Sequence, residues 1–204
     1  MHPITAKLLS LALSALLGGV ILFGWSAISW MALSWHETEP AVHGFVDQEQ
    51  VLTALQANAL ESGNYLVPFI PKLREGNTPE HEQTRMRAAE RMMAGPMAFV
   101  VVRHGPSDMA RLFATQFAIF VAGALLASIV VKSARPLPYW RRVLLVVVVG
   151  GAVAIVGHLP NWNWWGFSLA YILVEVADCL IGFFLAGLAI AAIARNRQPI
   201  DYPL

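Results

Sequence analysis

The chain has 204 residues, of which 57% are hydrophobic and 13% charged, and its formal net charge is +1. A soluble domain usually has about 45–50% apolar and about 25% charged residues. This composition, with a mean hydropathy of +0.57, therefore predicts an integral membrane protein. The single cysteine excludes an intrachain disulfide and metal sites built from several thiolates. Basic and aromatic residues are not interleaved in a run typical of nucleic-acid binding, so no nucleic-acid partner is expected.

Four stretches of the chain are apolar over a length that can cross a bilayer, which takes about 20 residues. The first far exceeds the core of a signal peptide, about 7–15 residues, so it is expected to remain as an anchor. We therefore predict an all-α membrane protein with four transmembrane helices. The predicted division is a tail and first helix at 1–33, a cap at 34–111, further transmembrane helices at 112–132, 143–159 and 166–194, a basic loop at 133–142, a turn at 160–165 and a tail at 195–204.

The distribution of charge predicts how these helices are oriented, because Lys and Arg are enriched on the cytoplasmic side. The two tails and the connection between the second and third helices hold half of the 14 basic residues and only one acid, Asp201. The 34–111 segment holds seven basic and ten acidic residues. Both termini are therefore expected in the cytoplasm, with the cap on the outer, periplasmic-type side of a bacterial-type inner membrane.

The cap is expected to be a small α+β structure of two helices and two short β-like runs. Asp47 predicts the start of one helix, and Thr78 followed by Pro79 predicts the start of another. The runs at 65–70 and 97–103 flank the second helix and are expected to pair as a ribbon. The methionines between residues 86 and 97 are expected to fill the core of this cap rather than to bind copper.

Glu175 and Asp178 are the most informative residues, because they lie far from the ends of the last apolar stretch. A charge at the centre of a membrane helix costs roughly 2.5–3.5 kcal/mol on insertion scales. At about 100° per residue, both acids share one helix face with Tyr171, Ser168 and small residues. These four polar residues are the candidate functional site within the membrane, and their face is expected to meet protein or water rather than lipid.

Rows of small residues in the other stretches predict close helix packing. They include Gly18 in the first, Gly150 in the third, and Ala114, Ala118 and Ala122 in the second. We therefore expect a compact four-helix bundle in which these rows face other helices.

The depth of the acids decides which groups can compensate their charge. With the last helix starting near Trp164, Glu175 lies roughly 16 Å below the outer surface and Asp178 about 4–5 Å deeper. His158 is near the end of the third helix, so no direct ion pair with Glu175 is expected. Three accounts stay open: the carboxyls are protonated, they line a water-filled path for protons or cations, or they meet a partner on another subunit.

His158, Trp162, Trp164 and Trp165 are candidates for a site at the outer interface. Tryptophan is typical of the boundary between membrane and water. An interfacial anchor and a platform for a ligand or quinone are the two interpretations of this cluster.

No metal or cofactor is expected. Of the six histidines, only His158 lies within a predicted span, which argues against haem held by two intramembrane histidines. His36, His104 and His158 can all lie near the outer surface, but nothing in their spacing brings them together as zinc or copper ligands. No nucleophile, metalloprotease or nucleotide-binding motif is present, so an enzyme is not expected.

These features predict an accessory, assembly or scaffolding subunit of an inner-membrane complex, which docks through small-residue helix faces and the intramembrane acids. The alternative is a small oligomeric transporter or channel, coupled to protons or cations, that uses Glu175 and Asp178 as its ion site. Besides the lipid bilayer, the expected partner is a membrane protein or a second copy of the chain.

Overall fold

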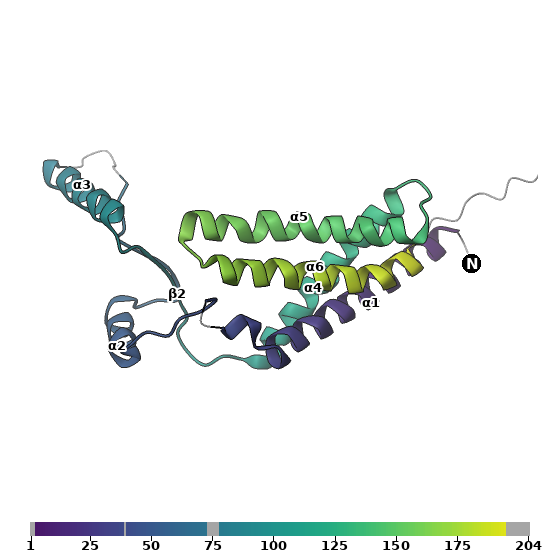
Figure 1. The fold of residues 1–204 in the computed structure, drawn as a ribbon, viewed down its shortest axis with the longest axis horizontal. Helices are drawn as coiled ribbons and strands as arrows, with labels where there is room; N and C mark the ends of the chain where they lie inside the picture. The colour runs from purple at the N-terminus through teal and green to yellow at the C-terminus, as the bar shows by residue number, and fades with distance from the viewer. Residues whose placement is uncertain (1–2, 39, 73–77, 195–204) are drawn as a thin grey trace, which may run out of the picture. The chain divides into compact units, whose positions relative to one another are not determined.

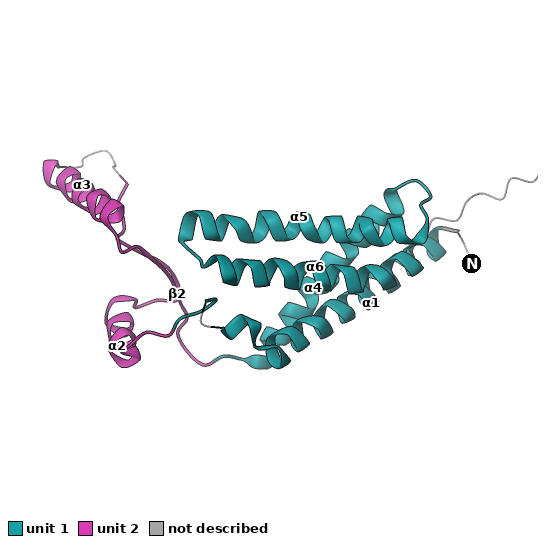
Figure 2. Cartoon of the chain, viewed as in Figure 1, with its two compact units in different colours: residues 1–43, 107–204 teal, residues 44–106 magenta. Residues whose placement is uncertain are grey.

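The computed structural model describes residues 3–38, 40–72 and 78–194, and it is mostly helical with one two-stranded sheet (Figure 1). The elements in chain order are α1 Pro3–Ala32, the short 3-10 helix η1 Ser34–Glu37, α2 Gln48–Asn58, β1 Gly63–Val67, α3 Pro79–Ala94, β2 Ala98–Val102, α4 Met109–Ser133, α5 Tyr139–Trp165 and α6 Leu169–Ile193. They form two compact units, unit 1 with residues 1–43 and 107–204 and unit 2 with residues 44–106 (Figure 2).

Unit 1 contains the four helices that, among the described residues, are long and apolar enough to cross a membrane. They are α1, α4, α5 and α6, with 25 to 30 residues each. At about 1.5 Å per residue, each is longer than the roughly 30 Å of a hydrocarbon core. The prediction of four apolar helices of spanning length is confirmed, and it indicates a multi-pass membrane protein.

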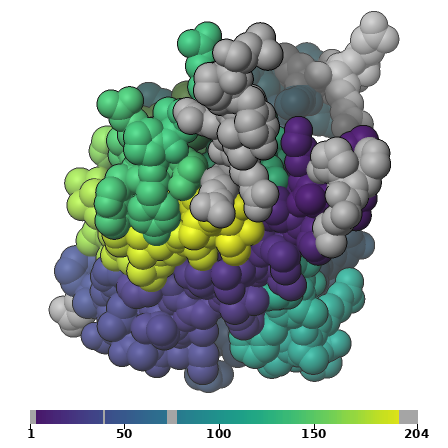
Figure 3. Space-filling model, turned by 90° about the vertical axis from the view of Figure 1, so that its right-hand side faces the viewer, coloured from purple at the N-terminus to yellow at the C-terminus, as the bar shows by residue number. Residues whose placement is uncertain are grey.

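The helices of unit 1 pack around α6, which contacts α5 on one side and α1 on the other. Figure 3 views the molecule from one end, with the yellow α6 between the green α5 and the purple α1. Helix α4 packs extensively against α1 but only sparsely against α5 and α6. The buried core joins small and branched side chains of all four helices, among them Leu22, Ala124, Ala127, Val131, Val146, Phe183, Ala186 and Ile190.

The two ends of unit 1 differ in chemistry. At the end where α1 starts, Lys132 donates to the Lys7 carbonyl at 3.1 Å and to the Ser10 hydroxyl, and the Tyr139 hydroxyl donates to the Leu188 carbonyl at 2.9 Å. We call this the lysine end. The opposite end holds η1 and the connection between α5 and α6, and we call it the histidine end.

Close packing occurs at glycines of α1 and α5, as predicted for Gly18 and Gly150. A Cβ added to Gly150 would lie 2.5 Å from the Cβ of Phe183, and one added to Gly18 would lie 2.9 Å from Cδ1 of Ile190. At Gly19, a Cβ would lie 2.8 Å from the Cα of Val121, so α1 and α4 touch there through backbone. Gly19 and Gly150 leave no room for a methyl group, because Val121 and Phe183 already occupy its place, whereas at Gly18 the nearest atom is the end of the Ile190 side chain.

The packing row predicted for α4 is wrong. Ala114, Ala118 and Ala122 are exposed. The buried residues of this helix are instead Ala124, Ala127, Ser128 and Val131. Small residues with a spacing of four occur on faces that meet lipid as well as on faces that meet protein, and both are apolar. The pattern therefore did not distinguish the two faces of α4.

The connection between α5 and α6 also differs from the prediction. Helix α5 does not end at residue 159 but continues through Pro160 to Trp165, and Gly166 then leaves the helix with a φ of 72°. The segment 160–165 is therefore helical rather than a turn. Membrane helices tolerate proline because neighbouring groups satisfy the carbonyl that loses its donor. The polar residues around Pro160 had suggested a turn.

Unit 2 has the predicted local signals in place. Asp47 caps α2 by accepting a hydrogen bond from the Gln50 amide at 2.9 Å. Thr78 caps α3 through a reciprocal pair of bonds with His81, and Pro79 is the first helical residue. Strands β1 and β2 pair antiparallel, from Gly63 opposite Val102 to Val67 opposite Ala98. Both predicted helices and the predicted ribbon are confirmed.

The predicted methionine core of unit 2 is wrong. Neither α2 nor α3 has a buried side chain. Met86 and Met93 are 49% and 89% exposed. A hairpin-sized ribbon has no second apolar layer against which long side chains can be buried, and two strands alone are marginally stable in water.

Candidate intramembrane site

The site begins with η1, which turns back against the end of α1. The amide of Leu33 donates to the Ile28 carbonyl at 3.2 Å as α1 ends. The next turn places the imidazole of His36 flat on the indole of Trp30, with ring centroids 3.9 Å apart and planes 13° apart. His36 is only 3% exposed as a result.

Ser29 fixes the orientation of this imidazole. Its hydroxyl is fully buried, lies 3.0 Å from Nε2 of His36 and accepts a 3.0 Å hydrogen bond from the indole of Trp35. Because Nε2 is engaged there, the other ring nitrogen, Nδ1, is the one that faces α6.

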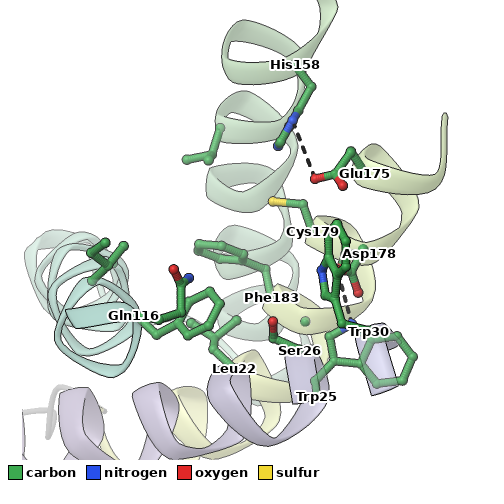
Figure 4. A pocket seen from close by; sticks show the side chains of 15 residues that line it. Leu22, Trp25, Ser26, Trp30, Gln116, His158, Glu175, Asp178, Cys179 and Phe183 are labelled. Carbon is green, nitrogen blue, oxygen red and sulfur yellow. Dashed lines mark hydrogen bonds and ion pairs between the residues drawn. The ribbon is translucent and has the colours of Figure 1, made fainter. Parts of the chain in front are cut away.

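Glu175 lies between two histidines. Its Oε1 is 3.6 Å from Nδ1 of His36. Its Oε2 is 3.8 Å from Nδ1 of His158 on α5, the contact that Figure 4 shows as a dashed line. We call these three residues the His–Glu–His cluster. Both distances exceed that of a direct hydrogen bond, and each contact is an ion pair only when its imidazole is protonated. Tyr171 lies one helical turn before Glu175 on α6.

The contact between His158 and Glu175 corrects the prediction that depth separates them. Glu175 is six residues from the start of α6 at Leu169, which places it about 9 Å from that end rather than about 16 Å. His158 is seven residues from the end of α5 at Trp165, which places it about 10 Å inside the helix. The predicted end of α5 and the predicted start of α6 both lay too early in the chain. With the observed bounds, the two residues lie at nearly equal depth.

Asp178 lies one turn below Glu175, and its backbone carbonyl accepts a 3.1 Å hydrogen bond from the Trp25 indole. Its side-chain atom Oδ1 is buried. Among the described residues, this atom, Oε1 of Glu175 and Nδ1 of His36 have no hydrogen-bond partner. Buried polar atoms without a hydrogen-bond partner are costly, so binding of a proton at this cluster would stabilise the site.

A cavity of about 500 Å³ lies beside the cluster, between α1, α4, α5 and α6. Its polar lining comprises His158, Glu175, Asp178 and Cys179 from α5 and α6, Ser26 from α1, and Gln116 across the cavity on α4 (Figure 4). Its remaining walls are apolar and aromatic, with Trp25, Trp30, Phe120 and Phe183 among them. Leu22 and Phe183 also belong to the buried core, so an apolar floor closes the cavity toward the lysine end.

Ser168 lies at the start of α6, where its hydrogen bonds hold the helix in place. Its hydroxyl caps α6 by accepting from the Tyr171 amide at 3.1 Å, and it donates to the Ala41 carbonyl at 2.9 Å. Both interactions fix the start of α6, and through it the height of Glu175. Ser168 does not line the large cavity.

Trp162, Trp164 and Trp165 lie on the last turns of α5 and are 48%, 71% and 38% exposed. Of the outer-interface candidates, only His158 lines the large cavity. The three tryptophans therefore lie on the surface of α5, near the histidine end.

Sequence reasoning missed His36 as a partner of Glu175. The available signal was physical: a carboxylate that is expensive in a membrane needs a compensating group, and histidine follows the first span within a few residues.

His104, which had been considered together with His36 and His158, lies in unit 2 and contacts the Ala59 carbonyl at 2.6 Å. Within the described ranges, no group of three or more His, Cys, Asp or Glu side chains is arranged to hold a metal ion.

Comparison with known proteins gives no relative from which a function can be carried over. No protein family matches the chain, and neither a curated protein nor a solved structure shows significant similarity. The geometry of the site is therefore the basis of the functional argument.

Proposed function

We propose that this protein is a small membrane transporter coupled to protons or cations, with the His–Glu–His cluster and Asp178 as its ion site. The observation that carries the proposal is the Glu175 carboxylate, which two imidazoles flank at the edge of a cavity inside four helices of membrane length. Ionisable groups within membrane helices are costly and typically mark proton relays or ion pathways.

The chemistry of the cluster suits proton exchange. Histidine is the side chain that changes its charge most readily between pH 5 and 8. A carboxylate between two imidazoles can accept a proton from one ring and then pass it to the other after a small movement, since both gaps are under 4 Å. The cavity gives this exchange access to water or to a ligand.

The same cluster weakens the case for the acids as docking residues. That case rested on the absence of a compensating group within the chain. His36 and His158 supply such groups for Glu175, so a second protein is not needed to explain this carboxylate.

The closed floor of the cavity favours a carrier over an open channel. Side chains of the buried core separate the acids from the lysine end. Transport would then need a second conformation in which the site opens toward that end, as in alternating access. In our proposal the lysine end and both termini face the cytoplasm of a bacterial-type inner membrane, and a second copy of the chain completes the path.

Proton flux into liposomes tests the proposal. Purified protein is reconstituted with a pH-sensitive dye inside the vesicles, and a pH step or a potassium diffusion potential is applied outside. We expect a protein-dependent pH change that Glu175→Gln abolishes and that Asp178→Asn reduces by about tenfold or more.

Glu37→Gln is the matched control, because Glu37 is an exposed carboxylate directly beside His36 in the sequence. This variant should retain the full flux. If wild-type protein produces no flux in either direction, or if Glu175→Gln retains it, proton coupling at this cluster is wrong.

A second candidate function is the accessory subunit, and a specific observation supports it. Several large apolar side chains of unit 2 are exposed, among them Phe45, Val46, Phe69 and Val101. Phe45 and Val46 are adjacent, and a contiguous apolar surface is typical of sites that bind another protein or a membrane. In this case docking would occur through unit 2 rather than through the intramembrane acids.

Co-purification in mild detergent separates the two candidates. If the chain is an accessory subunit, Phe45→Ser with Val46→Ser should release a membrane protein that co-purifies with wild type, whereas Glu175→Gln should retain it. Recovery of the same complex from both variants would contradict docking through unit 2.

A further inference from the structure

We infer that the large cavity of unit 1 binds an amphipathic organic cation, with its positive group at Glu175 and Asp178 and its apolar body against the aromatic walls. This inference rests on the proposed ion site and specifies the class of ligand that exchanges with protons there. It follows from four properties of the cavity: its size, its charge, its walls and its opening.

The cavity has the size of a ligand site. Its volume of about 500 Å³ lies within the roughly 300–1,000 Å³ that is typical of sites for small organic molecules. A bare proton or metal ion does not need a space of this size, whereas an organic molecule with several rings fills it.

The charge of the lining favours a cation. Oε1 of Glu175 and Oδ1 of Asp178 are buried acceptors without a hydrogen-bond partner among the described residues. Within the described part of the chain, no Lys or Arg contributes to the lining. The titratable groups that face Glu175 are His36 from η1, His158 from α5, and Tyr171, Asp178 and Cys179 from α6 itself. An anionic ligand would meet two carboxylates there, while an ammonium or phosphonium group would neutralise them.

The walls favour a cation that carries an apolar body. Trp25 and Trp30 from α1 lie on the same side of the cavity as Asp178 (Figure 4). Indole faces attract cations, by about 0.5–2 kcal/mol in general. Farther from the acids, Ile119 and Phe120 from α4 and Phe183 from α6 supply an apolar surface for the remainder of the molecule.

On its α4 side, the cavity has free space for a larger side chain. Helix α4 contacts α5 and α6 only sparsely. Gly123 of α4 lines the cavity, and a Cβ added there would have no atom within 4 Å. A larger residue at this position would therefore occupy the ligand space without displacing the core.

Binding of two ions of matched shape tests the inference. Tetraphenylphosphonium and tetraphenylborate have nearly the same size and four phenyl groups each, but opposite charge. Equilibrium dialysis of the purified full-length protein should give saturable binding of the phosphonium and no saturable binding of the borate. Glu175→Gln and Asp178→Asn should each weaken phosphonium binding by about tenfold or more, because each removes a charged partner.

Two further measurements do not depend on removing an acid. Gly123→Leu should weaken phosphonium binding by about tenfold because the leucine fills the cavity, whereas Gly24→Leu should leave it unchanged. Gly24 of α1 also has open space around it but does not line the cavity. Phosphonium binding to wild type should release protons into a weakly buffered solution, and it should weaken as the pH is lowered.

The outcomes are distinguishable from those of the proposed function. Equal binding of both ions, or unchanged binding in Glu175→Gln and Gly123→Leu, would overturn the inference even if protons cross the liposome membrane. Selective phosphonium binding that requires both acids and the open cavity would support it, and it would do so even where the liposomes show no proton flux.

Discussion

At the scale of single residues, Ser29 determines whether the His–Glu–His cluster can form. One hydroxyl group contacts the imidazole of His36 and the indole of Trp35, and it is fully buried. Without it, both rings would lose a partner in a place that water does not reach. Ser29 is a positioning residue, since it acts on Glu175 only through His36.

Ser29→Ala should therefore lower both stability and proton flux. Leaving a buried polar group without a partner costs about 1–3 kcal/mol. We expect a lower melting temperature in detergent and a changed pH profile of proton flux, which a purely structural defect would not produce. Ser34→Ala is the control, because Ser34 is an exposed residue of η1. A pH profile identical to that of wild type in Ser29→Ala would contradict the positioning role.

Trp25 has a comparable role for Asp178. Its indole donates to the Asp178 carbonyl at 3.1 Å and joins α1 to α6 beside the cavity. Trp25→Phe removes this donor but keeps most of the apolar surface, so the loss is that of one hydrogen bond, about 1 kcal/mol. For a chain of this size the melting temperature should fall by about 2–4 °C. Trp164→Phe, at a position that is 71% exposed, should change it by less.

At the scale of helices and strands, the sequence predicted those features that depend on neighbouring residues. Asp47 and Thr78 cap helices as expected, because a capping side chain reaches an amide only three residues away. The predicted end of α5 was wrong because proline and asparagine are typical of turns. In a membrane, the bilayer and the neighbouring helices decide where a helix ends.

The candidate site was predicted in part for the same reason. Glu175 and Asp178 could be identified from their position within an apolar stretch, which is a local property. The sequence offered His36 only as a nearby histidine, because its contact with Glu175 depends on stacking against Trp30 and on the buried hydroxyl of Ser29. His158 was assigned to the wrong depth because two helix ends had been misjudged.

Glycines at the helix contacts allow a direct test of the bundle. A Cβ at Gly19 would lie 2.5 Å from Cγ2 of Val121 and 2.8 Å from its Cα. Gly19→Ala should therefore lower stability by about 1–3 kcal/mol, as overpacking does. On the same helix, Gly24→Ala meets open space and should leave thermal stability in detergent unchanged or raise it. Equal effects of the two substitutions would contradict the packing of α1 on α4.

At the scale of the whole molecule, the charges predict on which side each segment lies. Cysteines placed in the Cys179→Ser background test this with a membrane-impermeant maleimide. In intact spheroplasts, Glu61→Cys of unit 2 should be labelled at once, and Arg135→Cys between α4 and α5 only after permeabilisation. The reverse pattern would invert the protein and place the cavity nearer the cytoplasm.

Our proposal involves three elements of the molecule, since Glu175, held by α6, would exchange protons with imidazoles held by η1 and α5. Infrared difference spectroscopy measures this most directly, since acidification converts a carboxylate into a carboxylic acid with its own carbonyl band. We predict a band that is absent in Glu175→Gln and present in Glu37→Gln. Its pH midpoint should change in both His36→Gln and His158→Gln. A Glu175 band whose midpoint is the same with and without these histidines would contradict the account.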